Sequence, residues 1–192
     1  MMMKYARNTL LAAVSAAALA ASPVVFAGGS LDISLADDVA RIGYDATQMG
    51  SGMHISMAAL HHEDDGDMVS AGLHVVDVRP SSSHLYIGVG AKVFAATSDY
   101  FDAVALGVGG FFRYSFPAVP DLSLAGYGYY APPVVSFADA ENMISTDVRA
   151  QFNLLPTARI YTGYRYNGIR LEDVDKRYKL GDGVHFGLTI DF

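Results

Sequence analysis

The chain has 192 residues, a net charge of −7 and no cysteine, and it contains 12 tyrosines, 10 phenylalanines and 19 glycines. The acidic balance argues against nucleic acid as a partner, and the lack of cysteine excludes a fold held together by disulfides. Charged residues make up 17% of the chain, fewer than the roughly one quarter that is usual in soluble domains.

The first 27 residues have the features of a secretory signal peptide. Two basic residues precede an apolar run at residues 10–21, and Val25 and Ala27 suit the positions that signal peptidase recognises. The run is shorter than the roughly 20 residues that a membrane-spanning helix needs, which disfavours a retained anchor. We therefore predict cleavage between Ala27 and Gly28, with residues 28–192 forming one domain.

Apolar and polar side chains alternate along almost all of this domain, which predicts β-strands rather than helices. In chain order, the predicted strands cover residues 31–36, 39–45, 53–61, 68–79, 85–96, 103–116, 122–130, 144–155, 158–171 and 183–192. The last strand is the clearest, because its apolar residues share one face and the chain ends on an aromatic. This pattern resembles the C-terminal strand of bacterial outer-membrane barrels. The barrel-assembly machinery recognises that strand. The residues of this predicted assembly signal are Val184, Phe186, Leu188, Ile190 and Phe192.

The connections between the strands alternate in character. One set is short, uncharged or proline-bearing, as in "QMGSG" and "FPAVPD", whereas the other is longer or acidic, as in "HEDDGD" and "LEDVDKRYKLGD". Short periplasmic turns opposite longer outer loops are typical of outer-membrane barrels. We predict an all-β fold, a closed antiparallel transmembrane β-barrel of ten strands. Eight strands remain an alternative because the first two are short, and a soluble β-sandwich or periplasmic calyx is the soluble alternative.

Isolated charges occupy the face opposite the apolar residues, and we predict that they lie in the lumen. Side chains fill the interior of a barrel of this size, and opposite charges pair there because an unpaired buried charge is costly. The alternative is a narrow pore in which a basic cluster of Arg113, Arg149, Arg159 and Arg165 attracts anions. The predicted lumen charges are Asp32, Arg41, Asp45, Lys92, Arg113, Asp147, Arg149, Arg159, Arg165 and Asp191.

Aromatic residues gather near the strand ends, which is typical of the girdles at the two membrane interfaces. A soluble core could use the same residues. The predicted girdle residues are Tyr114, Phe116, Tyr127, Tyr129, Tyr130, Tyr161, Tyr164 and Tyr166.

Several stretches resemble the YfaZ family of Gram-negative outer-membrane proteins. They include "HHEDDGDMVSAGLHV", "AVALGVGGFFRYSFP", "LAGYGYYAPPVVSF", "ARIYTGYRYNGIRLED" and "GDGVHFGLTIDF", which together span most of the domain. His61 and His62 depart from the family pattern before the acidic turn. The resemblance implies an outer-membrane β-barrel and supplies no catalytic residues.

The stretch "HHEDDGD" at residues 61–67 raises the question of a metal site. Adjacent strand residues point to opposite faces, so His61 and His62 cannot both bind one ion. The acidic run is short for a calcium loop, whereas Asp-Gly between two alternating runs is a strong hairpin signal. We predict a hairpin turn, with loose divalent-ion bridging to lipopolysaccharide phosphates as an alternative and no specific metal.

His54 and Ser56 share one strand face and raise the alternative of a lipid A hydrolase. Such catalysis needs an acid to orient the histidine, with Asp32 or Asp45 as candidates, and an oxyanion site. A protease-like alternative would pair Asp182 with His185. The two residues are three positions apart and hence on opposite strand faces, which weakens this alternative.

The sequence therefore predicts a small, non-enzymatic barrel of the Gram-negative outer membrane with a polar, mostly filled lumen and no cofactor. Its role would be structural or interaction-based, or the narrow passage of small solutes. The predicted partners are outer-membrane lipid, lipopolysaccharide and the barrel-assembly machinery.

Overall fold

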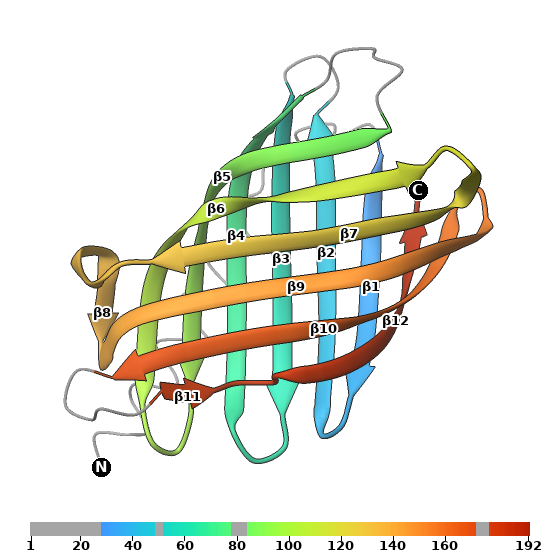
Figure 1. Ribbon diagram of the computed structural model, residues 1–192. Coiled ribbons are helices and arrows are strands. Elements are labelled where there is room, and N and C mark those ends of the chain that lie inside the picture. Colours follow the sequence, from blue (N-terminus) through green and yellow to red (C-terminus); the bar gives the residue numbers. More distant parts are fainter. Residues whose placement is uncertain (1–27, 49–51, 78–83, 172–176) are drawn as a thin grey trace.

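The computed structural model describes residues 28–48, 52–77, 84–171 and 177–192, almost all of them in β-strands (Figure 1). The predicted signal peptide lies outside the described residues, Ala27 included, and Gly28 is the first residue within them. No helix in the described part of the chain is both long and apolar enough to cross a membrane. The elements are β1 (Gly29–Ala36), β2 (Val39–Gln48), β3 (Met53–His62), β4 (Gly66–Val76), β5 (Leu85–Thr97), β6 (Asp102–Phe116), β7 (Val119–Ala131), the 3-10 helix η1 (Pro133–Val135), β8 (Ser136–Ala138), β9 (Ala140–Leu155), β10 (Ala158–Leu171), β11 (Arg177–Lys179) and β12 (Gly183–Asp191).

Ten of the strands within these residues pair in an antiparallel ring that runs β1-β2-β3-β4-β5-β6-β7-β9-β10-β12 and returns to β1. The ring closes where β1 pairs with β12, with Ile33 opposite Leu188. Closure pairs the backbone groups of every strand and removes the exposed edges, as a sheet in lipid requires. The predicted ten-stranded barrel is confirmed. The eight-stranded alternative is wrong, because β1 and β2 have 8 and 10 residues and are full members of the ring.

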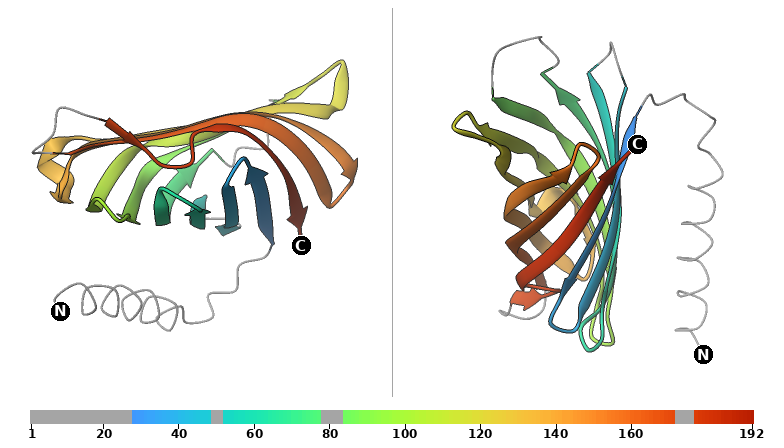
Figure 2. Two further views of the ribbon diagram at one scale, coloured as in Figure 1. Left: turned by 90° about the horizontal axis from the view of Figure 1, so that it is seen from below. Right: turned by 90° about the vertical axis from the view of Figure 1, so that its right-hand side faces the viewer.

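The strands are steeply tilted. In Figure 1, β2, β3 and β4 cross behind β7, β9 and β10, as opposite walls of a barrel with tilted strands do. Figure 2 shows the two walls from below and from the side, with β1 and β12 joining them. Side chains from strands far apart in the sequence therefore face one another across the lumen.

The connections sort onto the two ends of the barrel. At the turn end lie the connections β2–β3, β4–β5, β6–β7 and β9–β10, together with Gly28 and Phe192. At the loop end lie β1–β2, β3–β4, β5–β6, β7–β9 and β10–β12. Two of these loops contain short strands that the sequence did not predict, since β8 pairs with β6 and β11 pairs with β10.

The outer face of the barrel is apolar. Phe186 and Phe192 are 65% and 70% exposed, and the other three residues of the predicted assembly signal also point outward. A water-soluble sandwich or calyx would not expose so continuous an apolar surface, whereas lipid covers it in a transmembrane barrel. Further exposed apolar side chains come from all around the ring: Ile33, Leu35, Ile42, Met57, Leu73, Val75, Val89, Val93, Val108, Leu124, Val148, Phe152 and Ile160.

The aromatic residues divide between the two faces. Tyr114, Phe116, Tyr130 and Tyr164 are exposed on the outside, as an interfacial girdle requires, and Tyr166 is half-buried near Lys179. The girdle prediction is wrong for Tyr127, Tyr129 and Tyr161, which point into the lumen. The reason is strand alternation: Tyr129 is adjacent to the outward Tyr130, and Tyr161 lies two residues after the inward Arg159.

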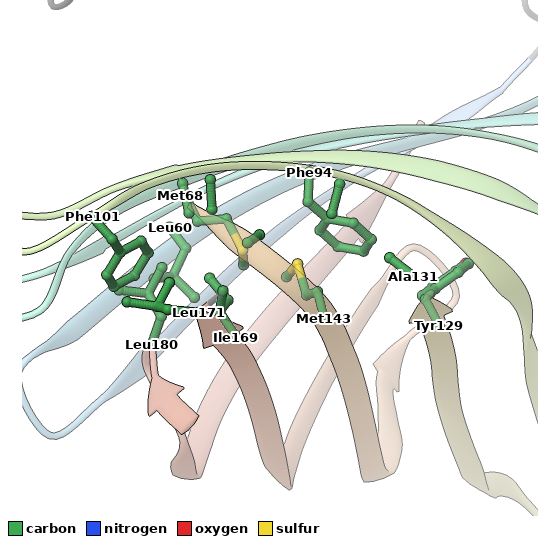
Figure 3. Close-up of a cluster of buried hydrophobic side chains, with 14 of the residues drawn as sticks. Leu60, Met68, Phe94, Phe101, Tyr129, Ala131, Met143, Ile169, Leu171 and Leu180 are labelled. Atoms are coloured by element: carbon green, nitrogen blue, oxygen red, sulfur yellow. The ribbon is translucent and has the colours of Figure 1, made fainter. Parts of the chain in front are cut away.

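The hydrophobic core fills the loop half of the lumen (Figure 3). Phe101 and Leu180 enter it from the loops, while Leu60 and Met68 enter from beside the β3–β4 turn. The prediction of a polar lumen is therefore wrong for most of this half, because apolar side chains predominate at the inward positions near the loop end, with Asn142, Ser145 and Asn167 buried among them. We call this core the plug; its large side chains are Leu60, Met68, Phe94, Phe101, Met143, Ile169, Leu171 and Leu180.

Candidate functional site

The turn half of the lumen contains a cavity of about 1000 Å³, which we call the turn-end cavity. It reaches from the barrel end at Gly28, His84 and Phe192 to Lys92 and Tyr129 at mid-height, where the plug begins. A cavity of this size is within the range of small-molecule sites in proteins.

All ten predicted lumen charges lie inside the barrel. Asp147 and Arg165 lie at mid-height and face each other, with 3.5 Å between Oδ2 and Nε. The other eight line the turn-end cavity: Asp32, Arg41, Asp45, Lys92, Arg113, Arg149, Arg159 and Asp191.

Asp32 is the centre of the first ion network. Its side chain is almost wholly buried, and its Oδ1 lies 2.7 Å from Arg41 Nη1 while its Oδ2 lies 3.1 Å from Arg149 Nη1. Thr189, directly opposite on β12, donates its hydroxyl to Oδ2 at 2.9 Å. One carboxylate therefore compensates two arginines, which come from β2 and β9.

Asp147 is the centre of the second network. His185 Nε2 lies 2.9 Å from its Oδ2, and both side chains are almost fully buried. Arg165 also donates to Ser34 Oγ at 2.8 Å. Asp182, considered above with His185, instead pairs with Lys179 at 3.0 Å in the β10–β12 loop. The two residues of the protease-like alternative therefore have separate partners.

Two further acids lie nearer the mouth of the cavity. Asp191 pairs with Arg159 at 2.6 Å, and Asp45 Oδ1 lies 3.2 Å from His54 Nε2. Both carboxylates are 35% exposed at the side chain, so these pairs are less desolvated than the one at Asp32.

Lys92 and Arg113 differ from the other cations of the cavity, because no carboxylate within the described residues forms an ion pair with either. Lys92 Nζ lies 4.8 Å and 5.2 Å from the ring centres of Tyr129 and Tyr127. Arg113 Nε is buried and has no hydrogen-bond partner in the described part of the chain. The cavity wall thus holds five arginine or lysine side chains and three carboxylates.

His54 and Ser56 lie on the inner face of β3 but do not form a nucleophile–base pair. Both ring nitrogens of His54 are engaged, Nε2 by Asp45 and Nδ1 by Thr47 Oγ1 at 2.9 Å. Ser56 Oγ is buried and has no hydrogen-bond partner among the residues described. Activation of a serine needs a hydrogen bond to its base, so this geometry does not support a hydrolase.

The "HHEDDGD" stretch forms the β3–β4 hairpin, with His62 opposite Gly66. His62 Nδ1 accepts from the backbone amides of Asp64 and Asp65, and His61 contacts Asp67 at 2.7 Å. The two histidines therefore have separate partners. Within the described ranges, no group of three or more histidine or acidic side chains could hold a metal ion.

Several buried polar contacts were not predicted from the sequence. His74 and Tyr129 form a hydrogen bond of 2.8 Å at the border between cavity and plug, and Ser145 donates to Asn167 at 2.7 Å. Strand alternation places each of these side chains on the inner face. Their partners depend on which strands face one another across the lumen, which local sequence does not contain.

The comparisons with known proteins agree with this fold. A family model described as "YfaZ precursor" matches residues 3–192. The chain belongs to the YfaZ family. Its relative "Outer membrane protein YfaZ" from Escherichia coli (strain K12) is 26% identical over 144 residues, which cover 74% of this chain and 76% of the relative. The resemblance to YfaZ proteins is confirmed, and this YfaZ-family barrel is an outer-membrane protein.

Two solved structures are similar to this YfaZ-family chain. The outer membrane protease OmpT from Escherichia coli is 11% identical, with a TM-score of 0.50 and 85% of this chain and 90% of that one covered. The KdgM porin, solved with disordered oligogalacturonate, is 9% identical, with a TM-score of 0.47 and 86% and 98% covered. The likeness to the protease shows a shared barrel fold alone.

Proposed function

We propose that this YfaZ-family protein is a non-enzymatic barrel with a structural or interaction role in the outer membrane, and that it does not pass solutes through its lumen. The observation that carries this proposal is the plug. Ile169 and Leu180 are 0% and 1% exposed, and apolar side chains from β3, β4, β5, β9 and β10 surround them. Ions do not cross a packed apolar constriction that excludes water.

The charges of the lumen also favour a structural role. Asp32 joins strands far apart in the sequence, since Asp32 on β1 contacts Arg149 on β9, and Arg165 on β10 donates to Ser34 on β1. Both contacts cross the β1–β12 ring closure, whereas Asp147 on β9 and His185 on β12 pair on one side of it. We infer that the networks fix the barrel rather than select ions.

A hydrolase role has little support. Both ring nitrogens of His54 are engaged by other residues, so His54 does not act as a base for Ser56, and both residues lie inside the barrel, away from the lipid. We expect lipopolysaccharide from cells with and without the protein to carry the same acyl chains by mass spectrometry. A changed acyl pattern that requires Ser56 would establish an enzyme instead.

We propose three partners for the surface of the barrel. Lipid would cover the apolar outer face, and the assembly machinery would read the strand that ends at Phe192. The loop end would face lipopolysaccharide, whose phosphates could share divalent ions with loop carboxylates. These loop carboxylates include Asp37, Asp38, Glu63, Asp64, Asp65 and Asp99. Within the described ranges they form no group of three or more that could hold a metal ion by itself.

Conductance in planar bilayers tests the proposal. Purified protein, first shown to be folded by its heat-modifiable migration on a gel, should give a flat current trace at all applied potentials. Stepwise channel openings by the wild-type barrel would contradict the proposal and favour the narrow pore.

A further inference from the structure

We propose that the turn-end cavity is a binding site for a small molecule that carries two or more carboxylate or phosphate groups. This inference goes beyond the structural role proposed above, since it concerns the part of the lumen that the plug leaves empty. It rests on the charges of the cavity wall, on the space beside them and on the route of access that the described residues leave open.

The first observation is the excess of positive charge. Five arginine or lysine side chains and three carboxylates line the cavity. Asp32 forms ion pairs with both Arg41 and Arg149, and Asp191 forms one with Arg159. Asp45 contacts His54. With the histidines neutral, the side chains of the wall therefore carry two more positive than negative charges.

The second observation is that the excess cations stand apart from the ion networks. Neither Lys92 nor Arg113 forms an ion pair with a carboxylate of the described chain, and Arg113 Nε is buried without a hydrogen-bond partner there. A partly buried cation without a counter-charge costs stability. Side chains that stabilise the barrel would instead be paired, as those around Asp32 are.

The third observation is the space beside Arg113. The small Ala125 of β7 lines the cavity and lies directly between Arg113 of β6 and Arg149 of β9. The short side chain leaves room for a ligand group between the two arginines. Lys92 lies deeper, where the side chains of Ser56, His74 and Tyr129 fill the space over the neighbouring Gly72 and Gly107.

The chemistry of the cations indicates the class of ligand. A guanidinium matches the planar geometry of a carboxylate and the oxygens of a phosphate, and a lysine adds a point charge to either. The volume of about 1000 Å³ exceeds what one inorganic anion needs, and Tyr86 and Tyr127 add aromatic wall. A small organic molecule with several anionic groups fits both features.

Among the described residues, the cavity is open at the turn end. The plug closes the cavity toward the loop end, so the ligand would enter and leave at the turn end, beside Gly28 and Phe192. With the turn end, where Gly28 and Phe192 lie, on the periplasmic side, this protein would take its ligand from the periplasm without passing it across the membrane.

The test uses the full barrel in detergent micelles and two probes, citrate for carboxylates and pyrophosphate for phosphates. Isothermal titration calorimetry should show saturable binding of at least one probe to the wild type. Binding of citrate alone would assign the carboxylate class, and binding of pyrophosphate alone the phosphate class. The double variant Lys92→Gln/Arg113→Gln should bind about a hundredfold more weakly, because each of the two lost charged hydrogen bonds costs about a factor of ten.

The matched control is Lys179→Gln, which removes a positive charge at the loop end, outside the cavity. It should bind the probes as the wild type does. Should the double variant fail to fold, as judged by heat-modifiable migration, Arg113→Gln alone carries the test. Absence of saturable binding of both probes to the wild type would overturn the proposal, and so would an equal loss in Lys179→Gln, which would indicate nonspecific charge attraction.

Discussion

The two halves of the lumen are built by the same strands but have opposite chemistry. On β5, Lys92 faces the turn-end cavity, whereas Phe94 two residues later is part of the plug. On β10, Arg159 lies in the cavity and Ile169 in the plug. Strand alternation decides only that a residue points inward. The position along the strand decides whether that residue meets charges or hydrocarbon.

The comparison shows how one small barrel can combine a dry constriction with a hydrated chamber. The plug is stabilised by close apolar packing, which excludes water. The cavity walls are stabilised by ion pairs, because each charge there needs either an oppositely charged partner or water around it. The two halves should therefore respond differently to substitution.

The largest loss is expected for Asp32→Asn in the cavity wall. The change removes the charge that Arg41 and Arg149 share and leaves both arginines without it. Breaking a buried pair in this way costs about 3–5 kcal/mol of unfolding free energy. Urea unfolding in micelles, followed by circular dichroism, measures it.

The control for Asp32 is Asp191→Asn, which breaks the more exposed pair with Arg159 at the mouth. Its loss should be about 1 kcal/mol or less. Equal losses for the two variants would mean that water reaches Asp32 as freely as it reaches the mouth.

Ile169→Ala should cost about 3 kcal/mol, because it opens a void in the plug at a side chain with 0% exposure. Ile160→Ala on the same strand is the comparison, since Ile160 is 43% exposed on the outer face. Lipid can fill the space left there, so we expect a clearly smaller loss in the same unfolding assay. A similar loss at both positions would indicate a loosely packed plug.

Tyr129→Phe tests the border between the two halves. The tyrosine hydroxyl lies 2.8 Å from His74 Nε2, and both side chains are buried. Removal of the hydroxyl leaves the imidazole nitrogen without this partner and should cost about 1–2 kcal/mol. Tyr130→Phe, with an outward side chain that is 47% exposed, should unfold like the wild type.

Arg113→Gln should change the unfolding free energy least, by about 0.5 kcal/mol or less in either direction. No ion pair within the described residues is lost at this position. Arg149→Gln, which does lose its pair with Asp32, should be clearly destabilised. Equal destabilisation of the two variants would give Arg113 a structural role and would weaken the case for a ligand.

Most of the fold could be predicted from the sequence, because a strand in lipid must alternate strictly. The alternation from Val184 to Phe192 places β12 correctly, whereas β7 and β9 begin three and four residues before their predicted starts. β2 runs on to Gln48, three residues beyond the predicted end, since the chain keeps pairing with β3 there. The same rule put all ten charges inside the barrel, although it did not give their partners.

The partners and the plug could not be predicted, because both depend on contacts across the lumen. Asp32 and Arg149 are 117 positions apart in the chain and meet only once the ring has closed. Phe94 and Ile169 share the inward face with Lys92 and Arg165. Alternation therefore predicts that all four lie in the lumen, but it does not tell which of them form the plug. Strand tilt brings Phe94 and Ile169 together in the plug, and the loop conformation adds Phe101 and Leu180 to it.

Thiol reactivity tests the division of the lumen most directly, because the chain has no native cysteine. Ser30→Cys places a thiol in the turn-end cavity, and Ala105→Cys places one in the packed core, where the native side chain is 1% exposed. In nanodiscs, a small charged methanethiosulfonate should modify the thiol at position 30 rapidly and leave the thiol at position 105 unmodified. Modification of both thiols at similar rates would contradict the account, since it would mean that water fills the lumen from end to end.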